Sequence, residues 1–238
     1  CDISKNAVYE LKEKCPLIKN VKSYKDYKEM LSAEKPELVA IATESGKHAD
    51  IAVDCINAGC NVIIEKPIAL SIKDADRIIE AAERTGVKVA ANHQNRFNGS
   101  IQKIRDAVEA GRFGRIFHAT TQIRWSRTES YYKQAPWRGT WEMDGGGSLM
   151  NQSVHTVDLM QWLMGEVESV TSHMGIYNHD IQTEDTTASL IKFRSGAVAT
   201  FVSTTCAYPG ISTEIMLYGT GGTVEADADC LKTWKMKD

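Results

Sequence analysis

Apolar and polar positions alternate in two different ways along the chain. In the first part, Leu38–Ala42 and Asn61–Ile64 are continuous apolar runs of strand length, which is typical of parallel strands covered on both faces. A third strand is predicted at Val87–Ala90. Amphipathic segments separate these runs, at residues 48–58 and 72–85. Strands that alternate with helices predict βαβ units and a doubly wound parallel sheet.

Capping residues mark the ends of the predicted helices in this part. Ser71 opens one helix, with Asp74 three residues on, and Gly86 ends it. Gly59 ends the helix over residues 48–58. Two more helices are expected earlier, over residues 3–14, where Ser4 can act as the cap, and 24–32.

The second part has a different pattern. We expect helices over Ser100–Ala110 and Ser148–Met164, with a loop rich in aromatic and polar residues between them at 131–147. The remaining segments are predicted strands, at 116–125, 167–177, 185–194, 197–206, 211–219 and 222–226. Ser195-Gly196 and Thr220-Gly221 suit hairpin turns. The pattern predicts a second α/β domain with a mainly antiparallel sheet, separated from the first near residues 96–100.

Composition and charge limit the classes of function. The formal net charge is −3 with 28 Lys and Arg scattered among the acids, so we expect no nucleic-acid partner. No apolar run approaches the roughly 20 residues of a membrane helix, and the first residues do not resemble a signal peptide. The six cysteines form no CxxC pair and no zinc-like spacing, so we expect no metal, inert thiols and a cytoplasmic location.

Glu65-Lys66-Pro67 follows the predicted strand Asn61–Ile64 directly. Ligands of open parallel sheets bind at the carboxyl ends of the strands. Lys66 there can direct its ammonium group at a substrate hydroxyl, although a surface lysine in a βα loop explains the tripeptide equally well.

Three glycines, residues 145–147, precede the helix that carries Asn151, His155 and Asp158. Spacings of four and three residues put these polar groups on one face of a single helix, which indicates a lined pocket. A lone histidine is commonly a core residue, but the glycine run allows a ligand to approach closely, which favours a functional role. Neither this run nor residues 219–222 has the strand–turn–helix context of a phosphate loop.

Several segments occur together in one order: Cys1-Asp2, Ile41-Ala42-Thr43 with His48, Glu65-Lys66-Pro67, Asn95-Arg96-Phe97 and the glycine run with His155. This order resembles the Gfo/Idh/MocA oxidoreductase family over nearly the whole chain. The resemblance implies an NAD-binding Rossmann domain at 1–97, whose first strand, Gly-rich turn, first helix and second strand would precede residue 1. It also implies a substrate-binding and oligomerisation domain at 98–238, and a homodimer or homotetramer.

The resemblance also implies roles for individual residues. Asp2 would hold the adenine ribose and favour NAD over NADP. The other expected cofactor-binding residues are Thr43, Ser45, His48, Glu65, Lys66, Pro67, Asn95 and Arg96. Lys66 and His155 match the catalytic positions. Asn151 is the third expected catalytic residue and stands where many relatives carry Asp. Because an amide can orient a hydroxyl but cannot accept its proton, we assign the general base to His155 and polarisation of the hydroxyl to Lys66.

The implied reaction is hydride transfer between NAD and a secondary hydroxyl of a sugar, nucleotide sugar or cyclitol. Expected substrate-binding residues, besides Asn151, are Arg124, Tyr131, Tyr132, Trp137 and Arg138, since aromatic faces suit sugar rings and arginine suits carboxylates and phosphates. The segment 137–151 is most similar to dehydrogenases of the 3-position of UDP-N-acetylglucosaminuronate. Two alternatives stay open: an NAD-dependent glycosidase, and a non-catalytic NAD-binding regulatory protein.

Overall fold

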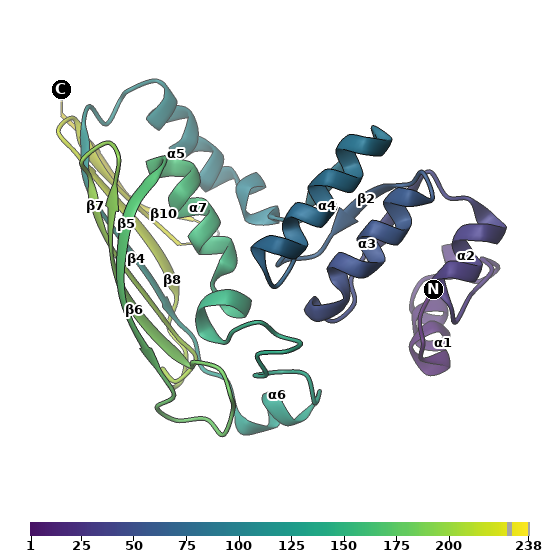
Figure 1. Ribbon diagram of the computed structural model, residues 1–238. Coiled ribbons are helices and arrows are strands. Elements are labelled where there is room, and N and C mark those ends of the chain that lie inside the picture. The colour runs from purple at the N-terminus through teal and green to yellow at the C-terminus, as the bar shows by residue number, and fades with distance from the viewer. Residues whose placement is uncertain (228–229, 238) are drawn as a thin grey trace. The chain divides into compact units, whose positions relative to one another are not determined.

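The computed structural model describes residues 1–227 and 230–237, in two compact units (Figure 1). The first unit contains residues 1–43 and 47–91, and the second contains residues 44–46 and everything from residue 92 onward. The sequence places the boundary after residue 97. In the structure the boundary falls after residue 91, because residues 92–97 pack with the second unit. Arg96, for example, makes two hydrogen bonds to the Asp158 carboxylate.

The first unit contains the predicted parallel sheet. Its strands are β1 (Leu38–Ile41), β2 (Asn61–Ile64) and β3 (Val89–Ala91), hydrogen-bonded in the order β1-β2-β3. Val62 of β2 pairs with Val39 of β1 and with Val89 of β3. All three strands run in one direction, so their carboxyl ends meet at one edge.

The first unit contains four α-helices, several of which begin or end at the predicted capping residues. They are α1 (Lys5–Lys14), α2 (Tyr27–Glu34), α3 (His48–Asn57) and α4 (Ile72–Thr85). The Ser4 and Ser71 hydroxyls accept the backbone N–H groups of Ala7 and Asp74. Gly59 and Gly86 have φ of 85° and 75°, the left-handed region in which only glycine is unstrained. These predicted helix ends are confirmed.

Helices α3 and α4 pack with the parallel sheet to form the core of the first unit. The fully buried side chains include Val62 and Ile64 of β2, Ala52 and Ile56 of α3, and Ile78 of α4. The apolar runs that predicted the strands therefore supply the core, as expected for strands covered by helices.

The second unit contains a seven-stranded sheet. Its strands are β4 (Ile116–Arg124), β5 (Val167–Gly175), β6 (Thr186–Phe193), β7 (Val198–Thr204), β8 (Thr213–Gly219), β9 (Gly222–Ala226) and β10 (Leu231–Met236). The order is β10-β9-β8-β4-β7-β6-β5. Every pair is antiparallel except β4–β7, which is parallel. The prediction of a mainly antiparallel sheet is confirmed, whereas β10 was not predicted.

Helices α5 (Gly99–Glu109) and α7 (Val154–Met164) cover one face of this sheet (Figure 1). Their side chains Ile101, Ile104 and Leu159 are buried against the inward residues of the strands, among them Ile123, Phe201 and Leu217. The helices place the segment before α7 at one end of the sheet. A short helix, α6 (Glu129–Lys133), extends into the segment 131–147, where we expected a loop.

The helix predicted over Ser148–Met164 is not continuous. Residues Ser148–Gln152 form a π-helical turn, and Ser153 (φ −110°, ψ 0°) interrupts the chain before α7 begins. The prediction that one continuous helix carries Asn151, His155 and Asp158 is therefore wrong for Asn151, which lies on the π-helical turn, whereas His155 and Asp158 lie on α7. Gly165, with φ of 87°, ends the helix as predicted.

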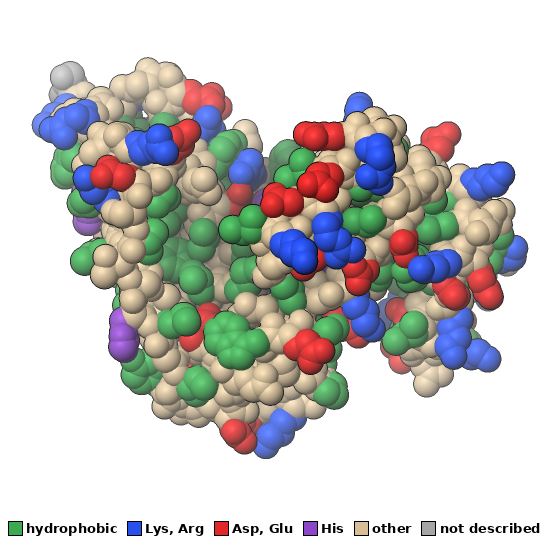
Figure 2. Space-filling model, in the orientation of Figure 1, with side chains coloured by type: hydrophobic (Ala, Val, Ile, Leu, Met, Phe, Trp, Pro, Cys, Tyr) green, Lys and Arg blue, Asp and Glu red, His purple; other side chains and the backbone are tan. Residues whose placement is uncertain are grey.

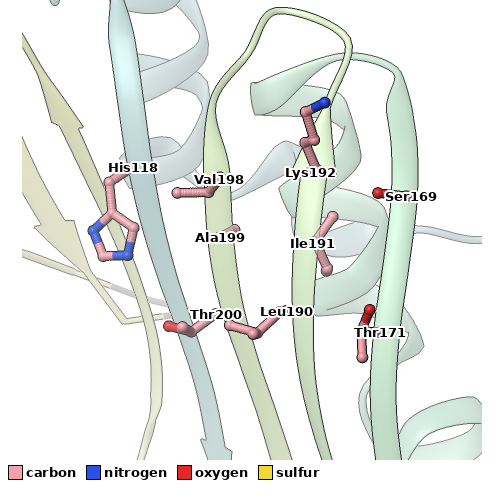
Figure 3. A pocket seen from close by; sticks show the side chains of 9 residues that line it. All are labelled: His118, Ser169, Thr171, Leu190, Ile191, Lys192, Val198, Ala199 and Thr200. Atoms are coloured by element: carbon pink, nitrogen blue, oxygen red, sulfur yellow. The ribbon is translucent and has the colours of Figure 1, made fainter.

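The second face of the seven-stranded sheet carries a groove (Figure 3). Its rows follow the strand register: Ser169, Lys192, Val198 and His118 in one row, and Thr171, Leu190, Thr200 and Thr120 in the next. Leu190 and Val198 are 63% and 50% exposed. Apart from Lys192 and His118, these two rows are uncharged, with apolar side chains open to solvent.

Charged residues are distributed differently elsewhere. On the face seen in Figure 2, Lys and Arg side chains alternate with Asp and Glu, and neither sign forms a continuous patch. Within the part of the chain that the structure describes, no helix has the length and apolar character needed to cross a membrane.

Candidate active site

The carboxyl edge of the parallel sheet carries the predicted lysine motif. Glu65 follows β2 directly and its N–H donates to the carbonyl of Ile41, the last residue of β1. His48 is buried, and its two ring nitrogens lie 2.8 Å from the Pro67 carbonyl and 3.1 Å from the Thr43 carbonyl. His48 thereby fixes the segments after β1 and β2, which present Thr43 and Lys66, at one edge.

Asp2 and Ser45 lie in different surroundings. The Asp2 carboxylate accepts the Ser4 N–H at 2.7 Å, at the start of α1, and Asp2 is exposed. Ser45 is buried in the segment of residues 44–46 that belongs to the second unit. In that segment the Gly46 N–H donates to the Met143 carbonyl, and a Cβ on Gly46 would lie 2.8 Å from the Met143 sulfur.

Glu184 fixes the glycine run that precedes Asn151. Its buried carboxylate accepts the N–H groups of Gly147 at 2.9 Å and Leu149 at 2.8 Å, and its backbone carbonyl accepts the N–H of Ser148. A Cβ on Gly147 would lie 1.8 Å from that carbonyl oxygen. Only glycine permits this approach, so Glu184 and Gly147 together set the position of the π-helical turn.

Asn151 lies on this turn, and its amide orientation is determined by its neighbours. The amide nitrogen donates to the buried Asp144 carboxylate, which can only accept when ionised. The amide oxygen accepts from Gln152 Nε2 at 2.9 Å. The second Asp144 oxygen accepts the Gly139 N–H at 2.8 Å. The glycine-rich segment 139–147 is therefore tied to Asn151 through Asp144.

His155 lies on the first turn of α7, beside a second histidine. The His155 and His93 rings are edge to face with centroids 5.5 Å apart. His93 Nδ1 is 3.8 Å from the Asp158 carboxylate, which also binds the Arg96 guanidinium. The structure thus brings His155 and Asp158 together with Arg96, a predicted cofactor-binding residue. Asn95 lies in the same short turn, Gln94–Phe97.

Two arginines stack on one tyrosine near the π-helical turn. The Arg138 and Arg127 guanidinium carbons lie 4.3 Å and 4.9 Å from the centre of the Tyr131 ring. Arg138 also lies 4.8 Å from the Trp137 ring. Gln152 connects this group to Asn151, since its amide donates to both the Asn151 oxygen and the Tyr131 hydroxyl. Three predicted substrate-binding residues, Tyr131, Trp137 and Arg138, therefore cluster.

The other two predicted substrate-binding residues, Arg124 and Tyr132, make different contacts, although the Tyr132 ring packs edge to face on Tyr131 with centroids 5.2 Å apart. Arg124 is on β4 and forms a 2.7 Å ion pair with Glu214 of β8. Tyr132 is buried, its hydroxyl is hydrogen-bonded to the Thr205 hydroxyl, and burial raises its pKa to about 12. Both side chains therefore contact protein groups in this structure.

His179, Asp185 and Cys206 come within 4.8 Å of one another and are residue types that bind metals. Both His179 ring nitrogens face oxygen atoms, Glu129 Oε1 at 3.1 Å and the Thr205 carbonyl at 3.3 Å. Burial alone would raise the pKa of Asp185, but the N–H groups of residues 177–179 donate to its carboxylate, and the net pKa is lowered. These contacts hold the loop before β6, and we assign no metal to them.

Sequence reasoning missed Arg127, Gln152 and Glu184. Gln152 stands next to Asn151 in a segment already singled out, so its position was an available signal. Glu184 reaches the site from a distant segment, and no local pattern marks either Glu184 or Arg127.

Comparisons with known proteins cover nearly the whole chain. Residues 9–93 match a family described as an oxidoreductase family with an NAD-binding Rossmann fold, and residues 101–225 match the GFO/IDH/MocA C-terminal domain. Together these matches include the edge with Lys66 and the segment with His155.

Individual relatives extend the comparison. The WlbA dehydrogenase from Bordetella pertussis, solved in complex with NADH and UDP-GlcNAcA, is 33% identical with a TM-score of 0.95, over 100% of this chain and 68% of that one. The WlbA enzyme from Chromobacterium violaceum is 33% identical with a TM-score of 0.94, over 100% of this chain and 69% of that one. Myo-inositol 2-dehydrogenase from Thermotoga maritima is 26% identical over 95% of this chain and 66% of its own length. The chain thus spans about two thirds of the length of these relatives.

Proposed function

Because the chain belongs to the Gfo/Idh/MocA oxidoreductase family, we propose that the protein is an NAD-dependent dehydrogenase of a secondary hydroxyl. The substrate class we propose is a sugar, nucleotide sugar or cyclitol. The observation that carries this proposal is the carboxyl edge of the parallel sheet, where His48 holds the segments bearing Thr43 and Lys66. The named activities of the relatives support the substrate class.

The residues at this edge fit a dinucleotide. Ligands of open parallel sheets bind there, and His48 holds together the two loops that carry Thr43 and Pro67. We assign the cofactor contacts to Thr43, Ser45, His48, Glu65, Lys66, Pro67, Asn95 and Arg96, and the adenine ribose to Asp2. When bound, NAD supplies the hydride acceptor.

The acid–base work falls to two residues. We assign His155 as the general base that removes the hydroxyl proton, since imidazole titrates near neutral pH. The Lys66 ammonium polarises the hydroxyl and stabilises the alkoxide that forms. Asn151, held by Asp144 and Gln152, positions the segment that leads to His155.

The first test uses the full-length gene product. Denaturing the purified protein and identifying released nucleotide by mass spectrometry is expected to yield NAD or NADH. The protein is then expected to produce NADH with at least one member of a panel of UDP-sugars, sugar acids and inositols. Release of NADP would contradict the role of Asp2.

The alternatives predict different results in the same assay. An NAD-dependent glycosidase would cleave a glycoside without net NADH. A regulatory NAD-binding protein would bind nucleotide, turn over nothing, and tolerate loss of Lys66 and His155. Either result would overturn the dehydrogenase proposal.

We also propose a cytoplasmic location. All six cysteines are present as thiols, which is consistent with a reducing compartment.

We further propose that the protein is a homodimer or homotetramer assembled through the grooved face of the seven-stranded sheet (Figure 3). Helices α5 and α7 cover the opposite face only. The rows of Thr, Val and Leu on the grooved face present little charge, which suits burial against an identical face of a second copy.

Leu190→Arg is expected to shift the full-length protein toward the monomer, because a charge would enter the groove on this face. Light scattering coupled to size-exclusion chromatography measures the mass. Ile72→Arg is the matched control, since Ile72 is 82% exposed at the start of α4 in the first unit. An unchanged mass for Leu190→Arg would mean that assembly, if any, uses another surface.

A further inference from the structure

Arg127, Tyr131, Arg138 and Gln152 form what we call the arginine cluster. Both guanidinium groups lie within 5 Å of the centre of the Tyr131 ring, at 4.3 Å and 4.9 Å. Among the residues described by the structure, neither arginine forms an ion pair with a carboxylate. Arg96 and Arg124 of the same unit, by contrast, bind Asp158 and Glu214. The cluster therefore concentrates two positive charges without a neutralising acid.

The hydrogen bonds inside the cluster leave a surplus of donors. Gln152 Oε1 accepts from Arg127 Nε at 3.1 Å and Nη2 at 2.8 Å. The Tyr131 oxygen accepts from Gln152 and from Arg138, so its own hydrogen must point to another acceptor. Arg138 Nε is buried with no acceptor in the described part of the chain. What the cluster lacks is an oxygen-rich acceptor.

Asp144 is the nearest acid along this network, and it does not fill that role. Its two oxygens accept the Gly139 N–H and the Asn151 amide. Gln152 Nε2 nevertheless joins the cluster to the Asn151 oxygen at 2.9 Å. The arginine cluster is therefore connected by hydrogen bonds to the π-helical turn that precedes His155. A ligand group bound by the cluster would lie next to that turn.

We propose that Arg127 and Arg138, with the Tyr131 hydroxyl, bind an anionic group of the sugar substrate, either a carboxylate or a phosphate. This inference rests on the proposed dehydrogenase function and narrows its substrate class to charged sugars, in preference to neutral cyclitols. Guanidinium groups match such oxyanions with paired, charge-assisted hydrogen bonds. Arg127 is thereby a specificity-determining residue.

The test compares Arg127→Gln and Arg138→Gln in the full-length protein, with UDP-N-acetylglucosaminuronate and myo-inositol as substrates. We expect KM for the charged sugar to rise about 10- to 100-fold in each variant, with kcat nearly unchanged, because the lost contacts bind a group remote from the hydroxyl. KM for myo-inositol and the Kd of NAD should not change. Arg194→Gln is the matched control, since Arg194 is an exposed residue paired with Glu166.

Further measurements separate the possible failures. UDP-N-acetylglucosamine, which keeps the diphosphate and lacks the carboxylate, identifies which anion is bound: it loses affinity in the variants only if the cluster holds phosphate. Calorimetric binding of each sugar requires no turnover. Wild-type affinity for the charged sugar in both variants would overturn the subsite even in an active dehydrogenase. Arginine-dependent binding without oxidation would keep the subsite and refute the proposed reaction. A lowered melting temperature would identify a variant that fails to fold. Arg138→Lys, which keeps the positive charge, separates the loss of charge from such a folding defect.

Discussion

Lys66→Met is expected to lower kcat by about a thousand-fold, while NAD stays bound. Methionine keeps most of the length of the side chain and removes the ammonium group that we assign to polarising the hydroxyl. The backbone conformation around residue 66 should be preserved, because the His48 ring nitrogen lies 2.8 Å from the Pro67 carbonyl. The rate of NADH production and the Kd of NAD, measured separately, check this expectation.

The comparison with His155→Ala decides how the two roles are divided. We expect a loss of similar size, about 10²- to 10⁴-fold, and a shift in the pH profile, since the base itself is gone. A wild-type rate for His155→Ala beside an inactive Lys66→Met would assign the base to Lys66. Lys73→Met, on the exposed first turn of α4, is the matched control and should remain fully active.

Gly147→Ala is expected to cause the largest loss of stability, roughly 3 kcal/mol or more in the free energy of unfolding. The added Cβ would lie 1.8 Å from the Glu184 carbonyl oxygen, a backbone atom that cannot rotate away. The segment would have to move, and Asn151 and His155 follow it directly. We therefore expect activity to fall even below the unfolding temperature. Denaturant melts with parallel activity assays measure both effects.

Two companion variants make this expectation specific. Gly99→Ala, at the start of α5, adds a Cβ that meets no atom within 4 Å and should not destabilise the protein. Glu184→Gln keeps the shape of the side chain that holds the π-helical turn, which we call the Glu184 clamp. Its amide has one oxygen, so it can accept only one of the Gly147 and Leu149 N–H groups. It should cost about 1.5 to 3 kcal/mol, the range for a hydrogen bond to a charged group. Equal stability of Gly147→Ala and Gly99→Ala would refute the clamp.

The features that the sequence predicts well are those whose causes lie within a few residues. Ser71 and Gly86 delimit α4 because a hydroxyl cap and a left-handed glycine act on their own helix. The turn at Ser195-Gly196 joins β6 and β7 for the same local reason. The apolar run of β2 becomes a buried parallel strand because periodicity reports burial directly.

The features that it predicts poorly depend on distant contacts. The break at Ser153 follows a turn that Glu184 clamps from another loop, so the apolar spacing of the segment suggested a single helix. Arg124 and Arg138 are the same residue type in the same region. Only the strand register, which brings Glu214 beside Arg124, shows that one arginine is neutralised and the other is not.

The parallel pairing of β4 with β7 has a consequence for how the second domain is made. β4 is flanked in the sheet by β7 and β8, which both come much later in the chain, after residue 197. During synthesis, β4 therefore emerges with both edges unpaired, whereas β5 and β6 can form their hairpin as neighbours. Such non-local pairing folds slowly and exposes strand edges to aggregation in the interval. On the ribosome, β4 therefore gains a partner on both edges only after β8 has left the exit tunnel.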